Sequence, residues 1–394
     1  MRITILTHYY PPEAGAPQRR WESLAVELAN RGADVTVHTG FPHYPDGRML
    51  APYVNRPWLT EEHQGVRVVR TAVAAVPNRG FAPRLLDHTA FALSSLVTAR
   101  LTGPADVVIV ESPPLFLAVS AVAYARAKRA RLVLNVSDLW PESAVELGAL
   151  TRPRMIKAAH RLACFAYRHA DVITVPTEGI LVALEGIPDA AGKVRHMPPS
   201  VDSAAFAAEP PRRSGPLRVL YAGTVALSQG LGTLVEAARQ AGPEVVSVTI
   251  AGGGLMVDEL QEDVRRRGIA NVTVAGAVAP SMVPGLYARA DTGAVLLRDL
   301  PIFRGALPTK LLESLAASRP VVLSAAGESA RFIEESGSGV VVPPEDPGAL
   351  ARAFHELHEA DDARFQALSE AAGRCAEAHD RSQATQRWLQ LLES

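Results

Sequence analysis

Short apolar runs rich in β-branched residues alternate along the whole chain with longer stretches rich in Ala, Leu and Arg. This alternation is typical of βαβ units, which build a parallel sheet covered by helices. Several runs are apolar at nearly every position, as expected of strands buried on both faces. The predicted strands are 3–6, 34–38, 67–70, 106–110, 132–136 and 172–175, then 217–221, 245–251, 272–275, 292–297, 320–324 and 339–342. The pattern therefore predicts an α/β fold.

One polar, Pro-rich segment, residues 202–215, interrupts this alternation, and a strand followed by Gly223 then restarts it. Such a segment is typical of a linker. A chain of 394 residues also exceeds one ordinary core. We expect two Rossmann-like domains facing each other across a cleft, over residues 1–203 and 204–375, followed by a C-terminal helix over 376–394. Ligands should bind at the carboxyl ends of the strands.

The composition, 48% apolar and 21% charged, is that of a folded soluble protein. The two cysteines form neither a disulfide framework nor a metal-ligand spacing, which favours a reducing cytoplasm. Met1 leads directly into a strand, and no run of 18 apolar residues is free of charge. We therefore expect neither a signal peptide nor a membrane span, and a cytoplasmic location.

Charge is distributed unevenly between the two halves. Residues 1–200 carry 22 Lys and Arg against 17 Asp and Glu, whereas residues 201–394 carry 18 against 24. A mildly basic first half suits an anionic partner or peripheral contact with the inner face of the membrane, although so small a difference also arises by chance. The basic stretch 151–168 could rest on anionic lipid or form a solvated helix. No dense basic stripe suggests nucleic acid.

The segment 308–313, Pro-Thr-Lys-Leu-Leu-Glu, places Lys310 and Glu313 one helical turn apart. Lys310 is one of only four lysines beside 36 arginines. A cation near the positive end of a helix suits a diphosphate, and a carboxylate can accept hydrogen bonds from ribose hydroxyls. On spacing alone, however, a helix start with a solvated Lys/Glu pair is the commoner explanation.

Glycine and small polar residues follow several of the predicted strands. Gly15 precedes a helix predicted from Gln18 onward, whose N-terminal N–H groups could meet a phosphate. Thr224 and Ser228 could hold phosphate oxygens after strand 217–221, and Gly252–Gly254 would let a nucleoside lie against the backbone. Each signal alone is weak, but their recurrence at successive strand ends favours a nucleotide site.

After strand 132–136, Asp138 and Glu142 flank Trp140 and could orient an acceptor hydroxyl or transfer a proton, although a helix cap would also explain Asp138. No Asp-x-Asp, His-x-x-His or carboxylate cluster suggests a metal. His8 and His88 are interpreted as structural residues. The absence of Gly-x-Ser-x-Gly and of a Cys/His pairing disfavours a covalent hydrolase.

Five motifs now point to a known family. They are His-Tyr-Tyr-Pro-Pro-Glu at 8–13, Phe-Pro-His-Tyr-Pro at 41–45, Asp-Leu-Trp-Pro-Glu-Ser at 138–143, Tyr-Ala-Gly at 221–223 with Gln-Gly-Leu at 229–231, and the segment 308–313. Together they resemble the family 4 glycosyltransferases, in particular their L-fucosamine-transferase-like branch. The resemblance implies the GT-B fold, a nucleotide-sugar donor held mainly by the C-terminal domain, metal-independent transfer with retention, and a final helix that crosses back to the first domain.

By position, the resemblance implies that Lys310 neutralises the donor diphosphate and that Glu313 binds the ribose hydroxyls. Asp138 falls near the position where many relatives have a catalytic-site histidine. Glu13 is a second residue that could orient the acceptor. The implied catalytic residues are Asp138, Glu13 and Lys310, and the implied donor-binding residues are Gly15, Gly223, Thr224, Gln229, Gly253, Val278, Arg304, Thr309, Lys310 and Glu313.

Two positions depart from the family pattern. Gly305 stands where relatives place a second glutamate eight residues before the ribose glutamate. Gln229 stands where they place another basic contact to the diphosphate, so Arg298 or Arg304 could supply that charge. The nucleotide end of the donor is therefore better defined than its sugar.

The resemblance thus implies a retaining transferase that uses a UDP-sugar, most simply a UDP-N-acetylhexosamine, without cofactor or metal. The acceptor would be a polyprenyl-diphosphate-linked saccharide or a soluble natural-product aglycone. A GT-B UDP-sugar 2-epimerase and a non-catalytic two-domain α/β ligand-binding protein remain alternatives.

Overall fold

The computed structural model describes residues 1–394 except 14, 45–46, 55, 77–80, 147 and 208–214. The chain divides into an N-terminal unit, Met1–Pro198 with Ala384–Ser394, and a C-terminal unit, Pro199–Gln383. These divisions fall after residues 198 and 383, whereas the sequence suggested 203 and 375. Most of the expected linker lies outside the described residues. Among the described helices, none combines the length and apolar character needed to cross a membrane.

The N-terminal unit contains an eight-stranded sheet of order β3-β4-β2-β1-β5-β6-β7-β8. Its strands are β1 (Arg2–Leu6), β2 (Asp34–Gly40), β3 (Trp58–His63), β4 (Val66–Thr71), β5 (Val107–Ser112), β6 (Arg131–Val136), β7 (Val172–Val175) and β8 (Val194–His196). All pairs are parallel except β3 with β4. The central strands β1 and β5 are almost wholly buried, which explains their continuous apolar runs.

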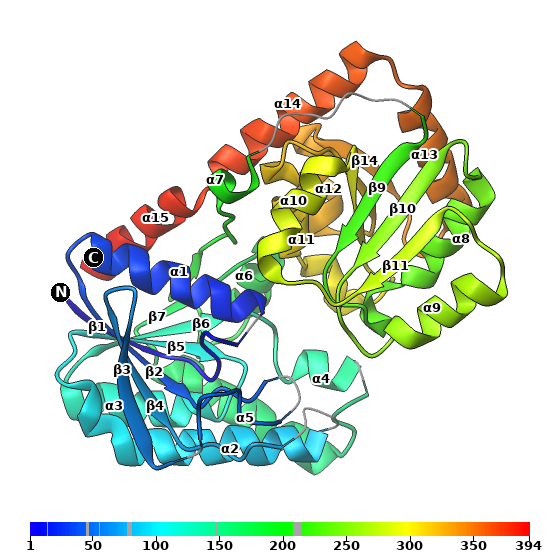
Figure 1. The fold of residues 1–394 in the computed structure, drawn as a ribbon. Helices are drawn as coiled ribbons and strands as arrows, with labels where there is room; N and C mark the ends of the chain where they lie inside the picture. The colour runs from blue at the N-terminus through cyan, green and yellow to red at the C-terminus, as the bar shows by residue number, and fades with distance from the viewer. Residues whose placement is uncertain (14, 45–46, 55, 77–80, 147, 208–214) are drawn as a thin grey trace. The chain divides into compact units, whose positions relative to one another are not determined.

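Helices cover both faces of this sheet (Figure 1). They are α1 (Ala16–Asn30), α2 (Phe81–Thr98), α3 (Leu117–Lys128), α4 (Glu142–Glu146), α5 (Pro153–His169), α6 (Glu178–Glu185) and α15 (Arg381–Glu393), with the short 3₁₀ helix η1 (Ala99–Thr102). Helices α2, α3 and α5 pack on one face, and α1 and α15 on the other. Trp21 of α1 meets Trp388 of α15 edge to face, with ring centroids 6.2 Å apart. The last helix of the chain therefore completes the core of the N-terminal unit.

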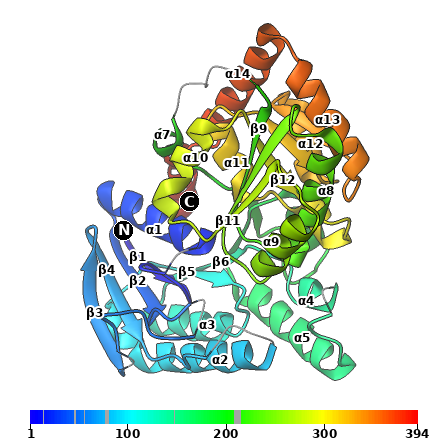
Figure 2. The ribbon, with the colours of Figure 1, turned by 45° about the vertical axis from the view of Figure 1, so that its right-hand side comes forward.

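The C-terminal unit contains a fully parallel six-stranded sheet of order β11-β10-β9-β12-β13-β14. Its strands are β9 (Leu217–Ala222), β10 (Val246–Ala251), β11 (Val272–Gly276), β12 (Thr292–Leu296), β13 (Val321–Ser324) and β14 (Gly339–Val342). Its helices are α7 (Ser203–Phe206), α8 (Leu231–Ala241), α9 (Val257–Arg266), α10 (Val283–Arg289), α11 (Thr309–Ala316), α12 (Glu328–Ser336), α13 (Pro347–Glu359) and α14 (Asp362–Ala378), with η2 (Leu227–Gln229), η3 (Pro280–Met282) and η4 (Pro301–Gly305). Figure 2 shows the sheet between two helical layers, α8, α9 and α13 on one face and α10, α11, α12 and α14 on the other.

Strand order reverses once in each sheet. In the first sheet, β2 to β4 lie on one side of β1, and β5 to β8 lie on its other side. In the second sheet, β10 and β11 lie on one side of β9, and β12 to β14 lie on its other side. Parallel α/β sheets bind ligands at the carboxyl ends of the strands beside such a reversal. The loops after β1, β5, β9 and β12 are therefore where a site is expected.

Candidate active site

Lys310 lies in the first turn of α11, and its side chain reaches the carboxyl end of β9. Its Nζ donates to the Tyr221 hydroxyl at 2.7 Å and to the Gln229 side-chain carbonyl. The same Nζ lies 4.3 Å from the centroid of the Tyr221 ring. The Tyr221 hydroxyl in turn donates to the Thr224 carbonyl at 2.6 Å. The ammonium is therefore held in place by neutral acceptors at the edge of the sheet.

Glycines leave room for this arrangement. A Cβ at Gly223 would lie 2.9 Å from Cε of Lys310, so any side chain there would displace the lysine. A Cβ at Gly252 would lie 1.8 Å from the Gly223 carbonyl oxygen, and one at Gly254 would lie 2.1 Å from the Val225 carbonyl oxygen. The loops after β9 and β10 therefore pack backbone to backbone, and a ligand here would meet main chain rather than side chains.

Burial lowers the pKa of Lys310 to about 7, although the nearby Glu313 carboxylate favours the charged form. A cation whose contacts are neutral dipoles and a ring face is costly to bury. An incoming anion would remove that cost and restore the charge. A lysine poised in this way at a strand-end site is typical of an anion-binding position.

The other predicted donor residues of this unit lie in neighbouring loops or on α11. Glu313 is half-buried one helical turn after Lys310, and Thr309 at the start of α11 is exposed. Thr224 is exposed in the loop after β9. Gly253, in the loop after β10, is exposed, and a Cβ at this position would lie 3.4 Å from the Cβ of Ala277. Ala277 directly precedes the half-buried Val278, so the loops that follow β10 and β11 lie against each other.

The structure distinguishes the two arginines proposed to replace a basic residue at position 229. Arg298 follows β12, its N–H donates to the Ser228 carbonyl at 3.2 Å, and its Cγ lies 3.6 Å from a Cβ built at Gly230. Both side chains are exposed and paired, Arg298 with Glu345 at 3.2 Å and Arg304, in η4, with Asp299 at 3.3 Å. Arg298 therefore borders the Gln229 loop directly, which sequence proximity alone could not decide.

In the N-terminal unit, Gly15 is the N-cap of α1, which begins at Ala16 rather than at Gln18. Neither a side-chain cap nor an acidic residue satisfies the first turn of this helix. The buried Gln18 folds back so that its Oε1 would lie 2.2 Å from a Cβ at Gly15. Residue 14, which precedes this cap, lies outside the described residues.

Glu13 is buried, with only 3% of its surface exposed. Its Oε1 accepts from the N–H groups of His43 and Tyr44, both at 2.8 Å, and its Oε2 accepts from the N–H of Tyr10 at 3.3 Å. Burial raises the pKa of Glu13, while these N–H groups favour the carboxylate. The side chain therefore joins two loops that follow β1 and β2.

Asp138 follows β6 and is half-buried. Burial raises its pKa, an effect opposed by hydrogen bonds from the Ser143 hydroxyl and the Leu139 N–H and reinforced by the Glu142 carboxylate. Its carboxylate thus lies beside the short helix α4. A raised pKa suits a group that must exchange a proton near neutral pH.

One polar network at the β1–β5 reversal was not predicted. Glu111, near the end of β5, is buried and pairs with Arg20 of α1. Arg20 also donates to the Ser137 hydroxyl at 2.8 Å, and the Thr7 hydroxyl donates to Glu111 at 3.1 Å. In the sequence, the only indication of this network was the Glu111 carboxylate near the end of the otherwise mostly apolar strand β5. Its partner arginine lies far away in the sequence.

Comparison with known proteins gives this geometry a context. Residues 15–200 match the family model of the glycosyl transferase 4-like domain, and residues 216–360 match the model of glycosyl transferases group 1. The two models together cover most of the chain, and both describe glycosyltransferases. The chain carries one family domain in each unit, and the activity it performs is nucleotide-sugar-dependent glycosyl transfer.

Curated relatives agree over nearly the full length. The chain is 27% identical over 374 residues to the probable glycosyltransferase WbjE of Pseudomonas aeruginosa, covering 91% of this chain and 90% of that protein. It is 26% identical over 383 residues to the putative colanic acid biosynthesis glycosyl transferase WcaI of Escherichia coli (strain K12), covering 90% of this chain and 92% of that protein. Its similarity thus extends to enzymes of cell-envelope polysaccharide synthesis.

Solved structures share the fold. Sucrose-phosphate synthase from Thermosynechococcus elongatus superposes with a TM-score of 0.78 at 18% identity, covering 100% of this chain and 98% of that chain. HepE from Anabaena, solved in complex with UDP and glucose, gives 0.73 at 16% identity, covering 100% of this chain and 99% of that chain. The predicted fold class, α/β units of the GT-B type, is confirmed.

Proposed function

We propose that this glycosyltransferase transfers a sugar from a UDP-sugar to a hydroxyl acceptor with retention and without a metal ion at the diphosphate. The observation that carries the proposal is Lys310, a cation held by Tyr221 and Gln229 at the carboxyl edge of β9. Its hydrogen-bond partners are neutral and the Glu313 carboxylate lies nearby, so a diphosphate would add negative charge beside the ammonium. The Gly223 and Gly252 backbones leave the space in which a diphosphate and nucleoside would lie.

Uridine as the base is supported by the fold relative HepE, which was solved with UDP. The five motifs shared with the L-fucosamine-transferase-like branch favour an N-acetylhexosamine as the transferred sugar. Glu313, one turn along α11 from Lys310, would accept hydrogen bonds from the ribose hydroxyls. Gly253 and Val278 border two adjoining loops that would hold the base.

The chemical barrier in such a transfer is separation of a diphosphate from an oxocarbenium-like sugar. The Lys310 ammonium would stabilise the negative charge that develops on the leaving diphosphate. Arg298, which borders the Gln229 loop, would supply the second positive charge. A positive charge fixed by the protein makes a divalent cation at the diphosphate unnecessary.

The acceptor hydroxyl would be oriented by Asp138, and its proton would pass to the departing phosphate. We assign this role to Asp138 rather than Glu13, because both oxygens of Glu13 already accept hydrogen bonds from backbone N–H groups. Asp138 is half-buried and has a raised pKa. The acceptor would be a lipid-linked saccharide or a soluble aglycone. The basic face of α5, which carries Arg154, Lys157 and Arg161, supports the first.

A nucleotide-sugar panel tests the donor. We expect UDP and UDP-N-acetylhexosamines to raise the melting temperature more than ADP-, GDP- or dTDP-sugars, with no requirement for added Mg²⁺ or Mn²⁺. Preference for another base would contradict the uridine assignment. Acceptor screening with the best donor would follow, and NMR of the product would give the anomeric configuration. Conversion of the donor to a 2-epimer without any acceptor would instead support the epimerase.

A further inference from the structure

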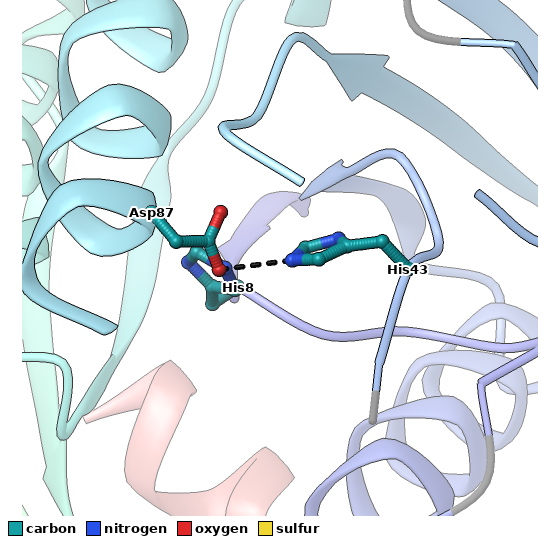
Figure 3. Close-up of side chains that lie close together, drawn as sticks. All are labelled: His8, His43 and Asp87. Carbon is teal, nitrogen blue, oxygen red and sulfur yellow. Dashed lines mark hydrogen bonds and ion pairs between the residues drawn. The ribbon is translucent and has the colours of Figure 1, made fainter. Parts of the chain in front are cut away.

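Three side chains that are distant in the sequence converge inside the N-terminal unit (Figure 3). His8 follows β1, His43 lies in the segment after β2, and Asp87 belongs to α2. All three are buried, with 1%, 3% and 5% of their side-chain surfaces exposed. One nitrogen of each histidine and one oxygen of the aspartate lie within 4.8 Å of one another.

The hydrogen-bond pattern of this cluster is unusual. Nε2 of His8 and Nε2 of His43 both lie 2.9 Å from the same oxygen, Oδ2 of Asp87. The other oxygen, Oδ1, is buried and has no hydrogen-bond partner among the described residues, and the same is true of Nδ1 of His8. Figure 3 shows Oδ2 between the two rings while the second oxygen points away. Two histidines that only shared a carboxylate would gain more by using both oxygens.

Convergence of three ligand atoms on one point is how a protein prepares a metal site. Two imidazole nitrogens and a carboxylate oxygen form a common ligand set for Zn²⁺. A tetrahedral ion with bonds of about 2.0–2.1 Å separates its ligand atoms by about 3.3 Å. The 2.9 Å contacts would therefore need to widen by only a few tenths of an ångström.

The surroundings of His43 fit the same interpretation. Its Nδ1 lies 2.8 Å from the carbonyl oxygen of Phe41, so Nδ1 must carry the hydrogen. Histidine ligands of metals usually donate their second N–H to a carbonyl or carboxylate, which turns the other nitrogen toward the ion. Glu13 fixes the backbone of the same segment by accepting from the His43 and Tyr44 N–H groups. His43 is thus oriented before any ion arrives.

An ion would also have a way in. A small pocket beside the cluster is lined by His43 and Asp87 together with Tyr9, Tyr44 and Arg84, among others. We propose that His8, His43 and Asp87 bind one divalent transition metal ion of the zinc class, which ties the end of β1, the segment after β2 and helix α2 together. The proposed ion would lie within the N-terminal unit, and the proposal does not depend on the proposed donor or acceptor.

The competing arrangement contains no metal. With Nδ1 of His43 bonded to a carbonyl, Nε2 would need its own hydrogen to face Asp87, which makes His43 an imidazolium. The two arrangements differ in what they bind, a metal ion or a proton. They can therefore be separated without measuring enzymatic activity.

The test uses the full-length, tag-free chain, stripped with a chelator and then titrated with Zn²⁺. We expect one equivalent of zinc per chain by elemental analysis, and a higher melting temperature than that of the stripped protein. Replacing Zn²⁺ with Co²⁺ should give the visible absorption of a four-coordinate ion with nitrogen and oxygen ligands. Mg²⁺ should produce neither effect, because it prefers oxygen ligands.

Asp87→Asn and His43→Ala should each weaken zinc binding at least a hundredfold. His88→Ala is the matched control, since His88 packs 5.0 Å from the His8 ring without belonging to the ligand set, and should still bind one zinc. A stripped chain that gains neither metal nor stability overturns the proposal, as does undiminished binding by both ligand variants. The Co²⁺ spectrum of the unsubstituted chain decides the question even if those variants fail to fold.

Discussion

Replacing Lys310 with methionine separates donor binding from stability. Lys310→Met keeps a side chain of similar length beside the Tyr221 ring but removes the ammonium that contacts Tyr221 and Gln229. If this ammonium pairs with the donor diphosphate, its loss should weaken UDP binding strongly. Because its contacts in the free protein are neutral, the folded state should lose little.

Two estimates give the size of the effect. Two unit charges about 4 Å apart interact by about 4 kcal/mol at an effective dielectric constant of about 20. Truncating one member of a hydrogen-bonded charge pair costs about 2–5 kcal/mol. Both correspond to UDP affinity falling by roughly 30-fold to several thousandfold. The melting temperature should stay the same or rise, because a buried cation with neutral partners has been removed.

The pH dependence adds a second signature. The pKa of Lys310 is about 7 in the free protein, and a bound diphosphate would raise it. UDP affinity should therefore fall as the pH rises above about 7, by at most about tenfold for each unit, until the pH reaches the raised pKa of Lys310 in the complex. The variant should lose this slope, because position 310 no longer titrates.

Calorimetric titration of UDP between pH 6 and 9, with melting curves for each protein, makes the measurement. Lys193→Met is a suitable control, since Lys193 also donates to neutral carbonyls, those of Tyr167 and Arg168, but lies in the other unit. The reasoning is refuted if Lys310→Met binds UDP within threefold of the original chain, or if the pH slope persists in it.

The remaining predictions concern backbone space, a loop contact and the last helix. Gly223→Ala should reduce UDP affinity at least tenfold while unfolding stays cooperative, because the added Cβ would stand 2.9 Å from Cε of Lys310; unchanged affinity would show that the lysine moves freely. Glu13→Gln should lower the free energy of unfolding in urea by about 1–3 kcal/mol, because an amide NH₂ would then face a backbone N–H. An unchanged free energy of unfolding would mean that the three hydrogen bonds to Glu13 contribute no stability. Trp388→Ala should cost about 3–5 kcal/mol, measured by the same unfolding curves, because it opens a cavity against Trp21; a loss below 1 kcal/mol would place α15 outside the cooperative core.

Much of the fold follows from local pattern. All twelve predicted strands are present, because strands such as β5 and β12 are buried at every position and are therefore mostly apolar. The two missed strands lack that signal. In β3, half-buried positions alternate with exposed ones and the sequence Trp-Leu-Thr-Glu-Glu-His is mostly polar, while β8 has only three residues.

The candidate site was predictable where its residues are close in sequence. Lys310 and Glu313 share one helix, and the glycines directly follow strands. The partners of Lys310 could not be read in this way, because Tyr221 looks like any aromatic residue of a buried strand. The Arg20–Glu111 pair and the convergence of His8, His43 and Asp87 depend on how distant elements pack.

The placement of α15 has a consequence for synthesis of the protein. Trp388 and Leu392 belong to the same core as Ile3 and Trp21, although they are made long after them. Ribosomes add about 5–20 residues per second, so the remainder of the chain needs on the order of 10–40 s to appear after Pro198. During that interval the nascent N-terminal unit exposes the apolar surface of α1 that α15 later covers. The C-terminal unit can therefore fold before α15 is available to complete the core of the N-terminal unit.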